Sequence, residues 1–137
     1  MAESAWRWLP LLGLFLAGTG SGADLPDQTQ CRQLWEQQLN VKTEIQGWCL
    51  LIDENRGNCL TCHHLNIPYD ASVLAASGNI GPVLESMQEK FQDRRALRDQ
   101  IFDASTNNPD TVMPLYGKHQ ILNSREIDQI VKFLMTF

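Results

Sequence analysis

The sequence predicts a small, mainly α-helical domain. The chain has 137 residues, 43% of them hydrophobic and 20% charged, a composition typical of one globular domain without disordered tracts. Apolar residues recur at spacings of three and four in several segments, which is the period of an amphipathic helix. Runs of alternating β-branched residues, which would predict strands, are almost absent from the sequence. The chain is too short for two independent cores, so the helices are expected to share one.

The first segment of the chain is predicted to be a secretory signal peptide over residues 1–23. Its apolar run at 8–17 follows Arg7 and precedes small residues that suit cleavage after Ala23. The alternative is a membrane anchor, but the run is shorter than the about 20 apolar residues that a spanning helix needs. We therefore expect export, removal of this segment, no membrane association of the mature protein, and an N-terminal extension over residues 24–43.

Two longer helices are predicted, one at each end of the mature domain. The first lies within residues 41–55, where apolar residues at 45, 48, 49 and 52 share a face, and it ends before Gly57. The last follows Asn123, which forms a capping-box pattern with Glu126, and has its apolar stripe at 127, 130, 131 and 134. Two shorter helices are expected between them, with apolar residues at 84, 87 and 91 and at 97, 101 and 104, the second capped by Asp93.

The charge of the chain argues against a nucleic-acid partner. Its formal net charge is −5, whereas nucleic-acid binding needs a basic surface. The one basic cluster has acidic neighbours at 89, 93 and 99, and it is interpreted as a solvated helix face rather than a docking patch. This cluster comprises Lys90, Arg94, Arg95 and Arg98.

The spacing of two cysteines gives the most specific chemical signal. Cys59, Cys62 and His63 form a C-x-x-C-H motif, which is typical of covalent attachment of haem c. Two thioether bonds would fix the porphyrin edge, and His63 would then reach the iron from one face. A structural zinc site would need four nitrogen or sulfur ligands. After Cys59, Cys62 and His63 or His64, only His119 remains downstream to complete the four. A redox dithiol would sit in a βαβ pattern, which the sequence lacks. We therefore expect one covalent haem c.

The other two cysteines, Cys31 and Cys49, are isolated and need a separate explanation. In an oxidising compartment, thiols that the fold brings together form a disulfide. Closing a loop of this size would contribute on the order of 3 kcal/mol to stability. The alternative is that Cys49 is a small, buried hydrophobic residue of a helix. The sequence leaves both interpretations open.

An iron with one histidine ligand needs a second ligand on the opposite face of the haem. Met87 lies on a helical apolar stripe, Met135 lies at the C-terminus, and His64 adjoins the first ligand too closely to reach around the ring. Met113 is favoured over His119 because it lies in an irregular loop, before a proline that has no amide hydrogen for a competing bond. The other interpretation of Met113 is a packing residue. A thioether ligand stabilises ferrous iron and would raise the reduction potential.

Four linked segments carry a resemblance to a known family. They are Gly57-Asn-Cys-Leu-Thr-Cys-His63, Gly78-Asn-Ile-Gly-Pro82, Asn108-Pro-Asp-Thr-Val-Met-Pro114 with Gly117, and Ile121-Leu-Asn-Ser-Arg-Glu-Ile127. Together they resemble SoxX, the monohaem c-type cytochrome subunit of the SoxAX complex of bacterial sulfur oxidation. The resemblance covers residues 44–137, the predicted cytochrome c domain. Leu115 and Tyr116 stand where the family more usually has Pro and Phe.

The resemblance implies a class I cytochrome c fold, with crossing N- and C-terminal helices around one covalent haem. Gly47 would lie at the crossing, and the Pro82 carbonyl would accept a hydrogen bond from His63. His63 and Met113 would be the axial iron ligands. The resemblance also implies a periplasmic protein whose partners are a SoxA-type cytochrome subunit, the SoxYZ carrier protein and a downstream electron-acceptor cytochrome. The complex would act as an L-cysteine S-thiosulfotransferase, joining thiosulfate to a SoxYZ cysteine.

The expected role within such an enzyme is electron transfer. Joining two sulfur atoms oxidatively releases two electrons, and one haem stores one, so a further redox centre is needed. The sequence offers no spare acid–base pair or activated nucleophile beside the haem motif. The chain is therefore predicted to have no catalytic residue, to accept electrons from the neighbouring subunit and to pass them on. The alternative is a freestanding periplasmic class I cytochrome c electron carrier.

Overall fold

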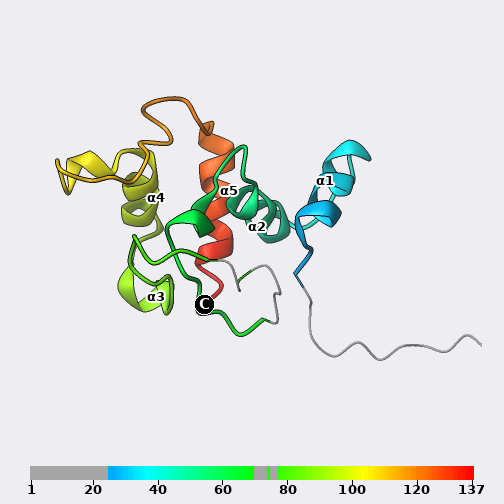
Figure 1. Cartoon of the computed structure of the whole chain (residues 1–137), viewed down its shortest axis with the longest axis horizontal. Coiled ribbons are helices and arrows are strands. Elements are labelled where there is room, and N and C mark those ends of the chain that lie inside the picture. Colours follow the sequence, from blue (N-terminus) through cyan, green and yellow to red (C-terminus); the bar gives the residue numbers. More distant parts are fainter. Residues whose placement is uncertain (1–24, 70–73, 75–76) are drawn as a thin grey trace, which may run out of the picture.

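The structure is a computed structural model that describes residues 25–69, 74 and 77–137, and it is mainly α-helical (Figure 1). The predicted signal peptide over 1–23 lies outside the described residues. Within them, the one β pairing is an isolated bridge between Leu65 and Leu84. The helices are α1 (Gln28–Glu36), α2 (Thr43–Ile52), α3 (Met87–Lys90), α4 (Arg94–Phe102) and α5 (Ser124–Leu134), with short 3₁₀ helices η1 (Cys59–Thr61) and η3 (Ala104–Thr106).

Helices α2 and α5 cross at the centre of the molecule and form most of its core (Figure 1). The crossing is close at Gly47, where an added Cβ would lie 2.0 Å from the backbone oxygen of Gln129. Beside it, the fully buried Trp48 packs against Phe133 with ring centroids 5.3 Å apart. The expectation that the first and last helices of the domain cross at Gly47 is confirmed.

The predicted helix ends agree well with the structure where a capping residue marks them. Asn123 accepts from the Glu126 amide and donates to its carboxylate, so the capping box of α5 is confirmed. Asp93 caps α4 through the amide of Arg95. The helix expected around Leu84 is shorter than its apolar spacing suggested, because Leu84 pairs with Leu65 as a bridge and α3 begins only at Met87.

Helix α1 lies within the N-terminal extension and was not predicted. Its start is set by Asp27, which forms a capping box with Gln30. A disulfide joins Cys31 to Cys49 of α2, with the two Cα atoms 5.4 Å apart, which decides between the two interpretations of these cysteines. Near the same contact, the Trp48 indole donates to the Pro26 carbonyl at 2.7 Å. The extension is therefore attached to the domain covalently and by hydrogen bonds, with α1 beside α2 (Figure 1).

The rest of the core collects around the crossing. Buried residues of α4 and of the loops pack against α2 and α5, namely Leu65, Met87, Leu97, Ile101, Tyr116 and Leu122. Among the described residues, no helix combines the length and the apolar character needed to cross a membrane. Between α2 and α3, the described residues 53–69, 74 and 77–86 lie outside the α-helices, as do residues 103–123 between α4 and α5, and both stretches carry predicted site residues.

Candidate haem site

The attachment motif follows a tight turn at the end of α2. Gly57 is buried there, and its amide donates to the Leu50 carbonyl at 3.1 Å. Asn58 adopts a left-handed conformation with φ 48°, which asparagine tolerates better than most residues, and the turn leads directly into η1. The side chain of Asn58 also accepts from the Thr61 hydroxyl at 2.6 Å. The turn thereby places Cys59 and Cys62 at the two ends of one short helical turn.

The segment 77–82 binds this motif through its backbone. The Gly78 amide donates to the Leu60 carbonyl at 2.7 Å, and the Gly81 amide donates to the Cys62 carbonyl at 2.8 Å. These bonds satisfy carbonyl groups that η1 is too short to use. The glycine-containing loop is thus a support for the motif, a role that sequence reasoning did not assign to Gly78 and Gly81.

His63 is held in one orientation by two contacts. Its Nδ1 lies 2.7 Å from the Pro82 carbonyl oxygen, which confirms the expected hydrogen bond. Because a carbonyl can only accept, Nδ1 carries the hydrogen in this contact, and the lone pair is on Nε2. The ring also lies against the bare backbone of Gly81, where an added Cβ would come within 2.4 Å of the imidazole. The arrangement presents Nε2 as the ligand atom and leaves no room for a side chain on the supporting residue.

Met113 lies in a loop that is closed at its base. The Phe102 carbonyl accepts from the amides of both Gly117 and Lys118, each at 3.1 Å. The Lys118 ammonium and the Asp103 carboxylate form an ion pair at 2.8 Å across the same base. The Met113 side chain is half-buried and packs against the hydrophobic core, while its amide donates to the Thr111 hydroxyl at 3.1 Å. The loop therefore holds this thioether at the edge of the core.

Tyr116 connects the methionine loop to the attachment motif. Its side chain is buried, and its hydroxyl donates to the Gly57 carbonyl, 59 residues away in sequence. Burial raises the pKa of the Tyr116 hydroxyl well above its ordinary value, so it remains a neutral donor. The aromatic residue that follows Met113 and Pro114 is therefore the physical link between the two halves of the candidate site.

The thiol of Cys59 is unsuited to redox exchange. Cys59 and Cys62 are both free cysteines of intermediate exposure. Burial of the Cys59 sulfur raises its pKa to about 12, although a hydrogen bond with Tyr116 opposes the shift. Catalytic dithiols work as thiolates and need a lowered pKa. The environment fits a cysteine that is held for attachment rather than one that attacks disulfides.

The other ligand candidates are placed less favourably than Met113. Met87 is buried as a core residue, as predicted, and Met135 caps the end of α5. His64 points its Nδ1 to the Ser77 hydroxyl at 2.6 Å, on the exposed side of the motif. His119 is exposed in the turn that follows the methionine loop.

The donor set fits a covalently attached haem c. Two free thiols, an oriented imidazole and a half-buried thioether are the groups that such a cofactor requires. The pocket for the imidazole is shaped by a glycine whose Cβ would overlap the ring. Structural zinc would need a cluster of four close N or S donors. Across residues 25–69, 74 and 77–137, no group of three or more His, Cys, Asp or Glu side chains could hold a metal ion.

Comparison with solved structures identifies the fold. The chain superposes with a TM-score of 0.53 on a chain in the crystal structure of SoxXA from P. pantotrophus, over 66% of this chain and 78% of that one. This chain has the class I cytochrome c fold. The two sequences are 23% identical, and at this distance the similarity is one of fold.

Comparison with other sequences gives less information about this chain than comparison with solved structures. No protein-family model matches the chain. An uncharacterized lipoprotein from Aquifex aeolicus (strain VF5) is 33% identical over 79 residues, which is 58% of this chain and 36% of the relative. The chain thus spans about a third of the length of this curated relative, whose name states no activity.

Proposed function

We propose that this chain is a periplasmic c-type cytochrome and the electron-transfer subunit of a SoxAX-type L-cysteine S-thiosulfotransferase. The observation that carries the proposal is the contact between His63 and Pro82, directly after two free cysteines, in a chain with the class I cytochrome c fold. The similarity in fold to a chain of SoxXA, together with the linked segments that resemble SoxX, supports the choice of complex.

The residues of the site would each have a distinct task. Haem c, once bound, supplies a one-electron iron couple. Cys59 and Cys62 would hold it through thioether bonds. The Pro82 carbonyl, by accepting from Nδ1, fixes the His63 ring and increases the basicity of Nε2. Met113 would supply a thioether to the iron and favour the reduced state. With His63 and Met113 both holding the iron, the haem would transfer electrons rather than bind a substrate.

The proposed direction of electron flow follows from the stoichiometry of the reaction. Forming a bond between a thiosulfate sulfur and the sulfur of a SoxYZ cysteine releases two electrons, and one haem accepts one at a time. We therefore place bond formation on a SoxA-type partner subunit. This chain would accept electrons from that subunit and pass them singly to a downstream cytochrome.

Co-expression with a SoxA-type cytochrome tests the subunit role. The two chains should co-purify from the periplasm, and thiosulfate with SoxYZ should reduce the haem of this chain only when the partner is present. A Cys59→Ala/Cys62→Ala variant of this chain, which has no means of attachment, is the control for the origin of the spectral change. A stable monomer that is reduced equally well without the partner would favour the freestanding carrier instead.

A further inference from the structure

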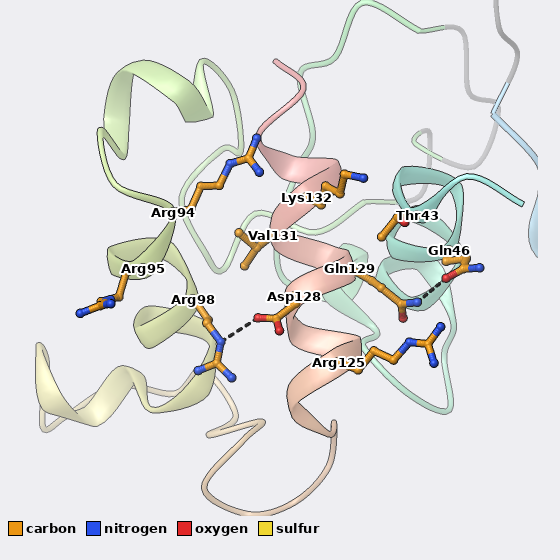
Figure 2. A pocket seen from close by; sticks show the side chains of 10 residues that line it. All are labelled: Thr43, Gln46, Arg94, Arg95, Arg98, Arg125, Asp128, Gln129, Val131 and Lys132. Carbon is orange, nitrogen blue, oxygen red and sulfur yellow. Dashed lines mark hydrogen bonds and ion pairs between the residues drawn. The ribbon is translucent and has the colours of Figure 1, made fainter.

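A basic groove lies along α5, between α4 and the start of α2. Its volume is about 500 Å³, and it is open to solvent. Three arginines of α4 and two cationic residues of α5 line it, and the fold brings together these two helices, which are far apart in sequence (Figure 2). We call this feature the α5 groove. Its lining residues are Thr43, Gln46, Arg94, Arg95, Arg98, Arg125, Asp128, Gln129, Val131 and Lys132.

The charge of the α5 groove is opposite to that of the rest of the chain. Five of its lining residues are cationic and one is anionic, a formal +4, so the remainder of the chain must carry −9 to give the net charge of −5. The net charge of the chain is negative and repels anions at long range. An anion that binds in the α5 groove must therefore be attracted by the cationic residues of the groove itself.

Only part of this positive charge is neutralised within the chain. Arg98 pairs with Asp128 at 2.7 Å, and Lys132 pairs with Glu44 at 3.1 Å. Among the described residues, Arg94, Arg95 and Arg125 form no ion pair, and all three are exposed. The unneutralised guanidinium groups are therefore free to bind a ligand without breaking a contact of the fold.

The spacing of these groups shows what size of anion fits. Residues 125, 128, 129 and 132 follow one stripe of α5, and the stripe is about 10 Å long at 1.5 Å per residue. In Figure 2, Arg94 reaches toward the end of α5 that carries Lys132, the Arg98–Asp128 pair lies midway, and Arg125 lies at the opposite end. A single oxyanion can form hydrogen bonds of about 3 Å at one end only. A polypeptide segment of about three extended residues spans the whole stripe.

We propose that the α5 groove binds an acidic segment of a partner protein, with carboxylates on Arg94 and Arg125 at its two ends. Guanidinium groups suit this task because their paired donors match the geometry of a carboxylate. The proposal does not depend on the role of the haem site, since none of Cys59, Cys62, His63 or Met113 lines the groove.

The test measures binding of a fluorescein-labelled hexaglutamate peptide to the full chain by fluorescence anisotropy. Arg94→Gln/Arg125→Gln removes two of the three unpaired cations, those at the two ends of the stripe, and should weaken binding about tenfold. The matched control Arg32→Gln/Lys90→Gln lowers the net charge equally at exposed sites outside the groove and should change the affinity less than twofold. Asp128→Asn removes the anion that neutralises Arg98 and should strengthen binding about threefold.

Several results would overturn the proposal. One is the absence of peptide binding, and another is equal weakening by the groove and control variants. Displacement of the peptide by sodium sulfate, where sodium chloride of the same ionic strength has no effect, would identify a site for a small oxyanion instead. Tighter binding of hexathymidylate than of the peptide would identify a nucleic-acid site. A dimer in sedimentation velocity that the Arg94→Gln/Arg125→Gln variant abolishes would show that a second copy of this chain occupies the groove.

Discussion

The replacement of Gly47 by alanine has two opposing effects on stability: a gain in helix propensity and a steric overlap with α5. In an isolated helix the change stabilises, by about 1 kcal/mol, because alanine is the better helix former. In this fold the new Cβ would lie 2.0 Å from the Gln129 oxygen and 2.5 Å from its carbonyl carbon. Ordinary contact begins near 3.4 Å, so α2 and α5 must move apart by about 1.4 Å. Both atoms that it meets belong to the backbone, and no side-chain rotation can relieve the overlap.

The movement would loosen the core at the crossing of α2 and α5. Trp48 and Phe133 pack against each other across the same crossing, with their ring planes tilted by 51°, and both are almost fully buried. Overpacking of this kind typically costs about 1–3 kcal/mol, and rigid backbone neighbours place Gly47→Ala at the upper end. After the gain in helix propensity, we expect a net loss of about 2 kcal/mol, or a fall in Tm of about 10 °C for a domain of this size.

Thermal unfolding of the holoprotein, followed by far-ultraviolet circular dichroism, measures this loss. Gln33→Ala introduces the same residue on an exposed face of α1 and should leave Tm almost unchanged. A Gly47→Ala protein that is more stable than the wild type, as helix propensity alone requires, would refute the argument from the close crossing.

Three further predictions concern the connections around the core. Replacing both Cys31 and Cys49 by serine should lower the free energy of unfolding by about 3 kcal/mol, and an unchanged denaturation midpoint would mean that α1 unfolds independently of the domain. Tyr116→Phe leaves a buried carbonyl without its donor and should cost about 1–2 kcal/mol in chemical denaturation, whereas a neutral effect would show that water replaces the hydroxyl. The pKa of Asp103 lies below its ordinary value of 3.8, chiefly because of the hydrogen bond from Lys118. A lowered carboxyl pKa adds stability above the unfolded-state value and loses it as the pH falls through the folded-state value. Wild type should therefore be more stable than Asp103→Asn above about pH 4 and should lose this advantage in stronger acid, and a pH-independent difference would contradict the ion pair.

The sequence predicted those parts of the fold that depend on local signals. Asn123 and Asp93 mark helix starts because their side chains bond to amides two or three residues away, and such contacts can be seen in a short stretch of sequence. Helix α1 has the same kind of signal in Asp27 and Gln30, but only three of its nine residues are apolar, which is a small set on which to predict a helix. The helix expected from Leu84 begins only at Met87 for the opposite reason, because pairing of Leu84 with the distant Leu65 overrides the local apolar spacing.

The candidate site was predictable in its chemistry but only partly in its construction. The C-x-x-C-H spacing predicts the attachment chemistry directly. The roles of Pro82 and Gly47 were predicted from the resemblance to a family. The link from Tyr116 to Gly57 spans 59 residues, and no pattern in the sequence marks it. The α5 groove was missed because Arg125 and Lys132 join the arginines of α4 only through the packing of the two helices. Contacts of this kind depend on the tertiary fold and cannot be derived from periodicity.

The ligation of iron by His63 and Met113 is the central claim, and the absorption spectrum of the ferric holoprotein tests it most directly. The wild type should show the weak long-wavelength band of a sulfur-to-iron bond. Met113→Ala should lose this band and shift to a lower reduction potential, while the control Met87→Leu, at a buried core position, should keep both. A Met113→Ala spectrum identical to that of the wild type would contradict the account, because it would show that another residue is the second ligand.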